Sequence, residues 1–168
     1  MKRLSTAAAL LASLTALPAA AQAQDVTRIA GAPTSPILSG VFVPAKADML
    51  ILSGQVPAPA VQGGAPDAIA TFGDTKTQAI STFKKIEALL KSQGYEMSDV
   101  IKLTVFLVGD PANGGKLDFK GFNEAYSQFF GTPTQPNKSA RSVVQVAALA
   151  GPAYLVEIEA TAAKTPKK

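Results

Sequence analysis

Two short apolar runs near the C-terminal end carry the charged residues best suited to chemistry. Arg141 stands near the start of the run 138–146, and Glu157 and Glu159 alternate within the run 155–160. Arg keeps its charge and a carboxylate resists burial, so each group must be exposed, paired or bound to a ligand. If the runs form neighbouring strands, Arg141 can bind a carboxylate while Glu157 or Glu159 handles a proton. The alternative is that all three are ordinary charged residues on a solvated sheet.

The residue types that the chain lacks narrow the possible chemistry. Its 168 residues include no Cys and no His. This excludes disulfides, Ser-His-Asp and Cys-His catalysis, and any metal site with His or Cys ligands. A reaction on this chain must therefore use Arg, Lys, Asp, Glu, Tyr, Ser and backbone groups, and we expect neither a cofactor nor a metal.

The first residues have the composition of an export signal. Lys2 and Arg3 precede an Ala- and Leu-rich segment over residues 5–17, and residues 21–23 read Ala-Gln-Ala, a typical cleavage site. The apolar segment is shorter than the ~20 residues that span a bilayer, which disfavours a membrane anchor. We expect cleavage after Ala23, a periplasmic or secreted protein, and no membrane association once the signal is removed.

The charge of the remaining chain gives no sign of nucleic-acid binding. The formal net charge is +4, and loss of Lys2 and Arg3 leaves 4 − 2 = +2. No basic stripe with interleaved aromatic residues is present, so we expect no nucleic-acid partner. The expected division of the chain is a signal peptide at 1–23, an N-terminal arm at 24–36, one folded domain at 37–162 and a basic tail at 163–168.

The apolar patterns of this domain predict the order β-β-α-β-α-β-β. The runs 40–43 and 49–53 predict two strands that the turn 44–48 joins as a hairpin. The run 100–108 is almost continuously apolar, which is typical of a strand buried on both faces. Strands that alternate with helices predict an α+β fold, in which one sheet carries both helices on one face. Apolar residues on the other face would favour self-association.

Two helices are predicted from apolar residues at helical spacing. The first begins with a cap at Asp74 or Thr75 and ends at Gly94. Its core stripe consists of Ala79, Phe83, Ile86 and Leu90. The second covers about 118–130 and presents an aromatic stripe. Both stripes are typical of a protein core and imply no cofactor.

Five segments, in this order and spacing, resemble the reactive intermediate deaminase family, RidA/YjgF. They read ILSGQVP at 51–57, KLTVFL at 102–107, FNEAYSQFF at 122–130, ARSVVQV at 140–146 and VEIEA at 156–160. The resemblance implies a chorismate-mutase-like fold, assembled as a homotrimer with ligand pockets between subunits. It also implies cofactor-independent hydrolysis of 2-enamine or 2-imine acids, as small-molecule carboxylate substrates, to 2-keto acids and ammonia.

The resemblance assigns roles to individual positions. Arg141 matches the arginine that grips the substrate carboxylate through two parallel hydrogen bonds. Glu157 matches the glutamate that orients or activates the attacking water. The backbone N–H of Val143 would join Arg141 in holding the carboxylate. Three further positions match residues that line the family's pocket: Ser53, Gly54 and Asn123.

Some positions depart from the family's pattern. Ile37 occupies the place of a frequent pocket Tyr, Val143 that of a common Cys, and Ser139 that of the usual Pro. Loss of the Tyr hydroxyl leaves open a second function, a non-catalytic periplasmic protein that binds small keto or carboxylic acids at Arg141. The ribonuclease activity sometimes ascribed to this family is less well supported, because the chain has no His and no basic groove.

Overall fold

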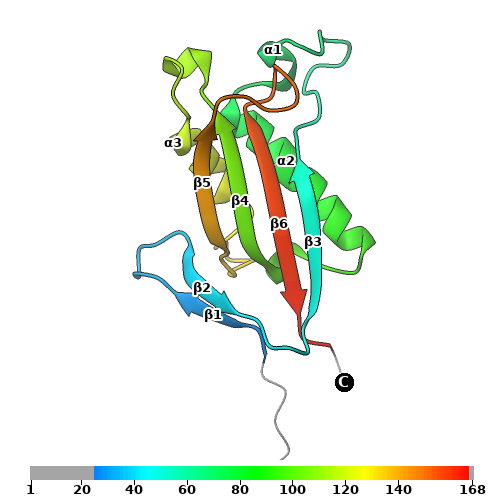
Figure 1. The fold of residues 1–168 in the computed structure, drawn as a ribbon, viewed down its shortest axis with the longest axis vertical. Helices are drawn as coiled ribbons and strands as arrows, with labels where there is room; N and C mark the ends of the chain where they lie inside the picture. The colour runs from blue at the N-terminus through cyan, green and yellow to red at the C-terminus, as the bar shows by residue number, and fades with distance from the viewer. Residues whose placement is uncertain (1–24, 167–168) are drawn as a thin grey trace, which may run out of the picture.

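A four-stranded mixed sheet forms the centre of the computed structural model, which describes residues 25–166 (Figure 1). The expected signal segment 1–23 lies outside the described residues. The strand order is β3-β6-β4-β5, in which β4 is parallel to β5 and antiparallel to β6, and β6 is antiparallel to β3. The strands are β3 Asp48–Gln55, β4 Val100–Val108, β5 Ala140–Val146 and β6 Val156–Lys164.

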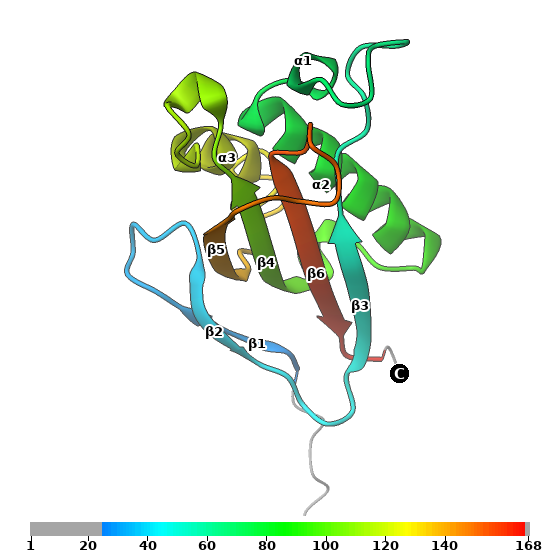
Figure 2. The same ribbon diagram turned by 45° about the horizontal axis from the view of Figure 1, so that its top comes forward.

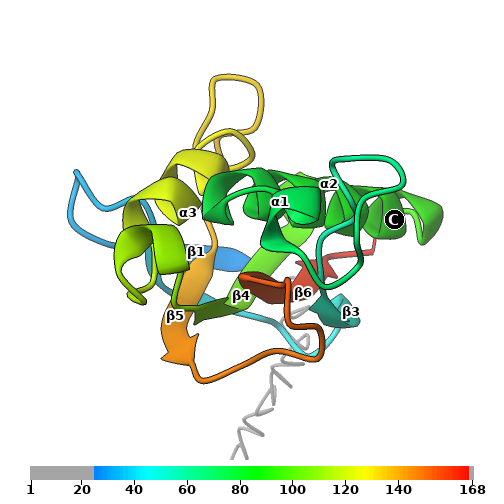
Figure 3. The ribbon, with the colours of Figure 1, turned by 90° about the horizontal axis from the view of Figure 1, so that it is seen from above.

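Both long helices lie on one face of this sheet, as the view from above shows (Figure 3). They are α2, Thr75–Ser92, and α3, Phe119–Tyr126. A short helix, α1, Ile69–Phe72, lies in the connection before α2, and single 3₁₀ turns precede and follow β4. The predicted α+β architecture with both helices on one face is confirmed. Within residues 25–166, none of the helices has the length and apolar character needed to cross a bilayer.

The sequence signals of α2 act as predicted. The Asp74 carboxylate accepts a hydrogen bond of 2.8 Å from the Thr77 N–H at the start of the helix. Gly94 has a φ of +74°, the left-handed conformation that glycine adopts without strain after a helix. The predicted core stripe is fully buried at Ala79, Phe83, Ile86 and Leu90.

An aromatic cluster joins α2 to α3. The Phe83 ring lies between 5.1 and 6.4 Å from four aromatic rings on and after α3: Phe122, Tyr126, Phe129 and Phe130. Tyr126 and Phe130 stack on each other at 4.7 Å. The regular helix is shorter than the predicted 118–130, because after Tyr126 the chain continues as turns. The aromatic stripe nevertheless lies in or against the core, as predicted, apart from Phe119, which is 49% exposed.

The strand β4 is buried on one face only, which corrects the prediction of burial on both. Leu103, Val105 and Leu107 have no exposed surface and pack with residues of α2 and α3. The alternate residues, Lys102, Thr104, Phe106 and Val108, are half-exposed. The physical reason is that both helices cover the same side, so the other face of the sheet stays open.

The predicted hairpin of the first two strands is wrong. The prediction that all strands form one sheet is wrong as well, because there are two sheets. The arm contains a strand, β1, Thr27–Ala30, which pairs antiparallel with β2, Leu38–Phe42, in a separate two-stranded ribbon. Figure 2 shows the chain leaving this ribbon, which lies near the start of β5, and crossing to β3 at the far edge of the main sheet. The turn is present, with a 2.9 Å hydrogen bond from Ala47 N to Pro44 O, but it joins two different sheets.

The last strand extends beyond the expected domain end at residue 162. Ala163 is buried, and Lys164 is the final residue of β6. The Lys164 ammonium donates a 2.7 Å hydrogen bond to the Gly94 carbonyl and lies 4.3 Å from the centre of the Tyr95 ring. The first two residues assigned to the tail are therefore part of the sheet, because a lysine stem can cover an aromatic ring while its charge stays near water.

Candidate functional site

Arg141 lies on β5 with its side chain under α3. It is in register with Leu103 of β4, so both side chains point to the helix-covered face. Its guanidinium carbon lies over three aromatic rings of α3, at 5.9 Å from Phe119, 5.1 Å from Phe122 and 4.4 Å from Tyr126. The aromatic stripe of α3 thus serves both the core and the arginine, because ring faces attract a cation.

The hydrogen bonds of Arg141 are incomplete. Its Nη2 donates to the Asn123 side-chain oxygen at 2.7 Å, whereas its buried Nη1 has no partner within residues 25–166. None of the three ion pairs among those residues includes Arg141. Burial lowers the pKa of Arg141, and the nearby Tyr126 phenol opposes that change. Arg still keeps its proton in proteins, so this guanidinium is a half-buried cation with a free donor, which suits a carboxylate.

Glu157 lies on the opposite face of the sheet from Arg141. It is in register with Phe106 of β4, three residues beyond Leu103, and the β4–β6 pairing is regular between those positions. An odd separation along a strand places side chains on opposite faces. The condition under which the two residues could act together in one chain, that their strands are neighbours, is not met, because β4 lies between β5 and β6.

The predicted site residues therefore form two groups in one chain. Arg141, Asn123 and Val143 lie together on the helix-covered side, where Val143 packs against the core. On the open side, the Glu157 carboxylate lies directly against the Gly54 backbone. The exposed Ser53 lies beside Gly54 and lines, with Glu159, a shallow hollow of about 280 Å³.

The backbone at Ile37 lies near the start of β5, the strand that carries Arg141. We call Arg141, Asn123 and Val143 the arginine group. Its side chain is half-buried against the core, and its backbone N–H and carbonyl both bond the Ser35 hydroxyl. The next residue, Leu38, donates from its backbone N to the Ser139 carbonyl at 3.1 Å. The start of β2 is thereby fixed next to the start of β5, two residues before Arg141.

Two residues near Arg141 were missed by sequence reasoning. A cavity of about 370 Å³ adjoins the arginine group, and both Tyr126 and Lys138 line it together with Asn123. Tyr126 was assigned only to the core, and its contact with Arg141 depends on the α3–β5 packing. Lys138 did carry a signal, since it is the one charged residue between 125 and 140.

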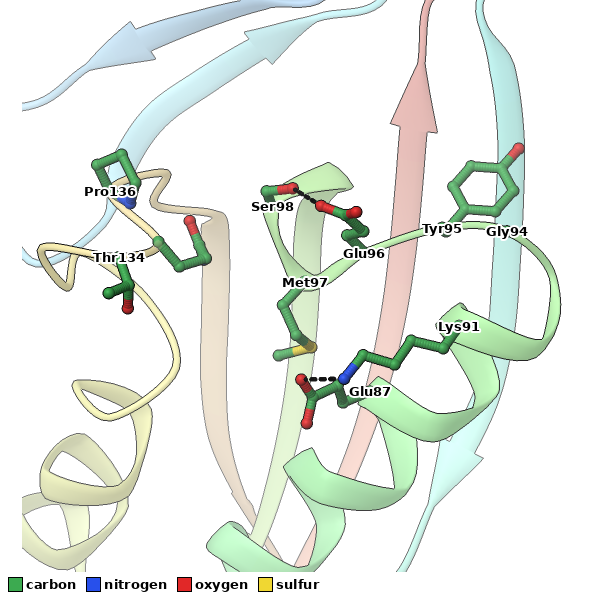
Figure 4. Close-up of a pocket in the computed structure, with 10 residues that line it drawn as sticks. Glu87, Lys91, Gly94, Tyr95, Glu96, Met97, Ser98, Thr134 and Pro136 are labelled. Atoms are coloured by element: carbon green, nitrogen blue, oxygen red, sulfur yellow. Dashed lines mark hydrogen bonds and ion pairs between the residues drawn. The ribbon is translucent and has the colours of Figure 1, made fainter.

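A larger cavity lies away from every predicted site residue. It has a volume of about 490 Å³ and lies between the end of α2, the segment 94–98 and the loop 134–136 (Figure 4). Its charged groups already have partners: Lys91 binds Glu87 at 2.9 Å, and the Ser98 hydroxyl lies 3.4 Å from the Glu96 carboxylate. This cavity therefore offers no free cation for a substrate carboxylate.

No group that could hold a metal ion, meaning three or more His, Cys, Asp or Glu side chains, occurs in the described part of the chain. The chemistry that these residues can supply is carboxylate binding at Arg141 and proton handling at Glu157. Within one chain, the two cannot act on one small molecule, because the sheet separates them.

Comparison with known proteins shows which families and proteins the sequence resembles. A model of the family described as Endoribonuclease L-PSP matches residues 34–164. The chain is 35% identical to a RutC family protein of Pyrococcus horikoshii over 117 residues, which are 70% of this chain and 80% of the relative. It is 32% identical to the 2-iminobutanoate/2-iminopropanoate deaminase of Escherichia coli over 138 residues, 82% of this chain and 94% of the relative.

A solved structure agrees with the fold. The crystal structure of E. coli TdcF with bound serine superposes with a TM-score of 0.53 and 33% sequence identity, and the match covers 80% of this chain and 92% of TdcF. Several relatives thus have names that refer to deamination or to the Rid proteins.

Proposed function

The chain belongs to the Endoribonuclease L-PSP family, which includes the RidA/YjgF proteins, and on that basis we propose that it hydrolyses reactive 2-imino and 2-enamino acids to 2-keto acids and ammonia. The observation that carries the proposal is Arg141, a half-buried cation whose buried Nη1 has no partner among residues 25–166. An unpaired buried donor is costly, and a substrate carboxylate would satisfy it through two parallel hydrogen bonds.

The reaction demands little beyond placement of the substrate and a water molecule. The C=N carbon of a protonated imino acid is already electrophilic, so water adds to it, the C–N bond breaks, and a keto acid and an ammonium ion leave. Arg141 holds the carboxylate, helped by the Val143 backbone N–H, and Glu157 takes the proton from the attacking water and returns one to the leaving nitrogen. Ser53, Gly54 and Asn123 shape the pocket. Neither a cofactor nor a metal enters this scheme.

We propose further that each site is built from two copies of the chain, within a homotrimer. Arg141 and Glu157 face opposite sides of one sheet, so an arginine of one copy must meet a glutamate of another. Apolar residues on the open face support such contacts: the Ile51 side chain is 74% exposed and that of Val144 is 45% exposed. The edge strand β5, which carries Arg141, also has only one partner strand in the described sheet.

The test mixes two inactive variants. Arg141→Ala and Glu157→Gln are each expected to abolish the acceleration of keto-acid formation from imines that an amino-acid oxidase generates in situ. When equal amounts are unfolded and refolded together, half of the subunits keep Arg141 and half keep Glu157. If each site draws on two copies, about a quarter (½ × ½) of the sites regain both groups, and activity returns to about a quarter of wild type. No recovery, or a monomer in sedimentation, would exclude the shared site.

Ile37 favours a second candidate function. A pocket without the frequent Tyr hydroxyl suits a protein that binds keto or carboxylic acids at Arg141 and releases them unchanged. The two functions separate in the assay on wild-type protein: binding of a keto acid that requires Arg141, without acceleration of imine hydrolysis for any of several amino acids, identifies the binding protein.

We also propose that the protein is exported and cleaved after Ala23. The sequence pattern of residues 1–23 supports this proposal. Mass spectrometry of protein expressed in a Gram-negative host from the full-length sequence tests it. An intact N-terminus in the cytoplasmic fraction would contradict it.

A further inference from the structure

The 370 Å³ cavity beside α3 adjoins the arginine group and carries a second cation. Six of its lining residues are Pro36, Asn123, Tyr126, Phe130, Gly131 and Lys138. Asn123 and Tyr126 also contact the Arg141 guanidinium directly, through the 2.7 Å hydrogen bond and the 4.4 Å ring contact. These two side chains are therefore shared between the cavity and the carboxylate-binding group.

The Asn123 amide presents donors rather than acceptors to a ligand. Arg141 has only N–H groups, so the atom that faces it must be the Asn123 oxygen. The amide nitrogen then points away from the guanidinium. It donates to no group in the described part of the chain, so its two N–H bonds stay available to a molecule in the cavity that Asn123 lines.

Lys138 adds a positive charge that pairs with no carboxylate in the described part of the chain. Its Nζ donates a 2.6 Å hydrogen bond to the Ser35 carbonyl, which uses one of its three N–H bonds. None of the three ion pairs within residues 25–166 includes Lys138. Its stem lies over Gly131, where a Cβ atom would come within 3.4 Å of the Lys138 Cε. The ammonium is thus held at the cavity by a carbonyl and by packing.

Ser127 also lines the cavity, and its hydroxyl donates to the Glu124 carbonyl at 3.0 Å; the other walls are mainly apolar, and no Asp or Glu lines the cavity. Such a lining fits a hydrocarbon segment that ends in an anionic group. We propose that Lys138 makes the site selective for imino acids whose side chain ends in a carboxylate, such as the imine of glutamate. This inference rests on the proposed deaminase function: Arg141 takes the carboxylate next to the C=N carbon, and Lys138 takes the distal one.

The experiment compares imines that differ in charge and little in shape. Amino-acid oxidases generate the imines of glutamate, glutamine and leucine in the presence of the full-chain protein. We expect kcat/KM for the glutamate imine to exceed that for the glutamine imine about tenfold, the ratio that a charge-assisted hydrogen bond supplies. Lys138→Met should abolish this ratio without changing the rate with the leucine imine. Lys138→Arg should retain the ratio, as should Lys84→Met, which alters an exposed lysine on α2.

Two outcomes overturn the inference: equal rates with the glutamate and glutamine imines in wild type, or an equal loss with all three imines in Lys138→Met. The latter would assign Lys138 a structural role through Ser35. Calorimetric measurement of 2-ketoglutarate and 2-ketovalerate binding tests the role of Lys138 independently of the proposed deaminase activity. If no imine is hydrolysed but 2-ketoglutarate binds about tenfold more tightly than 2-ketovalerate in a Lys138-dependent manner, the proposed deaminase activity is excluded. The binding of a distal carboxylate by Lys138 is then supported. Hydrolysis without any preference for the dicarboxylate would support the deaminase activity and exclude binding of a distal carboxylate by Lys138.

Discussion

Gly54 lies directly against the carboxylate of Glu157. A Cβ atom on residue 54 would sit 1.9 Å from the Glu157 Oε1 and 2.8 Å from its Cδ, far inside any real contact. The pairing of β3 with β6 is irregular between Leu52 and Gln55, at the same place. The absence of a side chain at residue 54 therefore sets where the Glu157 carboxylate can rest.

Gly54→Ala should consequently reduce turnover more than stability. The added methyl group displaces only the far end of a side chain, so the melting temperature should change little. If Glu157 is the proton-transferring group, kcat for imine hydrolysis should fall at least about tenfold with KM nearly unchanged. The matched control is Gly40→Ala, whose Cβ would meet Ile29 Cδ1 at an ordinary 3.6 Å. Equal kcat values for the two variants would contradict the role given to Glu157.

Replacement of Asn123 should reveal how the Arg141 charge is kept available. Asn123→Ala removes the one hydrogen bond that the guanidinium makes to a side chain of residues 25–166, and should lower kcat/KM about tenfold. Asn123→Asp should raise KM further, because a carboxylate at this position would pair with Arg141 and compete with the substrate. Steady-state kinetics of both variants, beside the same substitutions at the exposed Asn113, provide the measurement. A KM lower in Asn123→Asp than in Asn123→Ala would show that Arg141 does not bind the substrate.

Gln78 should contribute more to stability than its polar side chain suggests. It is fully buried, donates to the Gly73 and Ala153 carbonyls at 2.9 and 3.0 Å, and accepts from Leu155 N at 2.7 Å. Gln78→Leu leaves all three backbone groups without partners, so the free energy of unfolding should fall by about 3 kcal/mol. Urea denaturation tests this value against Gln93→Leu at an exposed position. A loss no larger than that of the control would refute it.

The ion-pair cluster at Glu124 should make stability depend on pH at the acid end. Lys120 and, secondly, Lys76 lower the pKa of Glu124 to about 2 from its ordinary value of 4.5. Because the folded-state pKa is the lower one, the stabilisation is complete above pH 4.5 and disappears as the pH falls towards 2. The effect should be small and sensitive to salt, since these side chains are partly exposed.

The measurement for this cluster is the melting temperature of wild type and Glu124→Gln between pH 7 and pH 2. The difference should be largest at neutral pH and low salt, and should vanish near pH 2. Glu159→Gln, which removes an exposed carboxylate outside the three described ion pairs, corrects for the change in net charge. A difference that stays constant across this range would mean that Glu124 acts through packing rather than charge.

Elements with local signals could be predicted from the sequence. The start of α2 at its Asp74 cap and its end before Gly94 follow from neighbouring residues, as does the presence of a strand at β4. The pairing of β2 could not be predicted, because its partner is the four-residue β1, too short to show an alternating pattern. A strand's partner depends on contacts distant in the sequence, whereas a helix cap does not.

The same distinction applies to the site. The residue types of Arg141 and Glu157 suggested chemistry at once, and the family resemblance supplied the roles expected of them. Their placement on opposite faces depends on the insertion of β4 between β5 and β6, which no local pattern indicates. The cavity with Lys138 depends in turn on how the segment before β5 packs beside α3.

The position of β6 has a consequence for how the chain is made. It follows the other described strands in the sequence, yet it lies inside the sheet and is the only partner of β3 among them. Asp48 thus pairs with Lys164, 116 residues away, and Val100 pairs with Ala162. Such a topology has high contact order and predicts slow folding. A growing polypeptide without residues 156–164 cannot join β3 to β4 and β5, so the sheet forms only after these residues have left the ribosome.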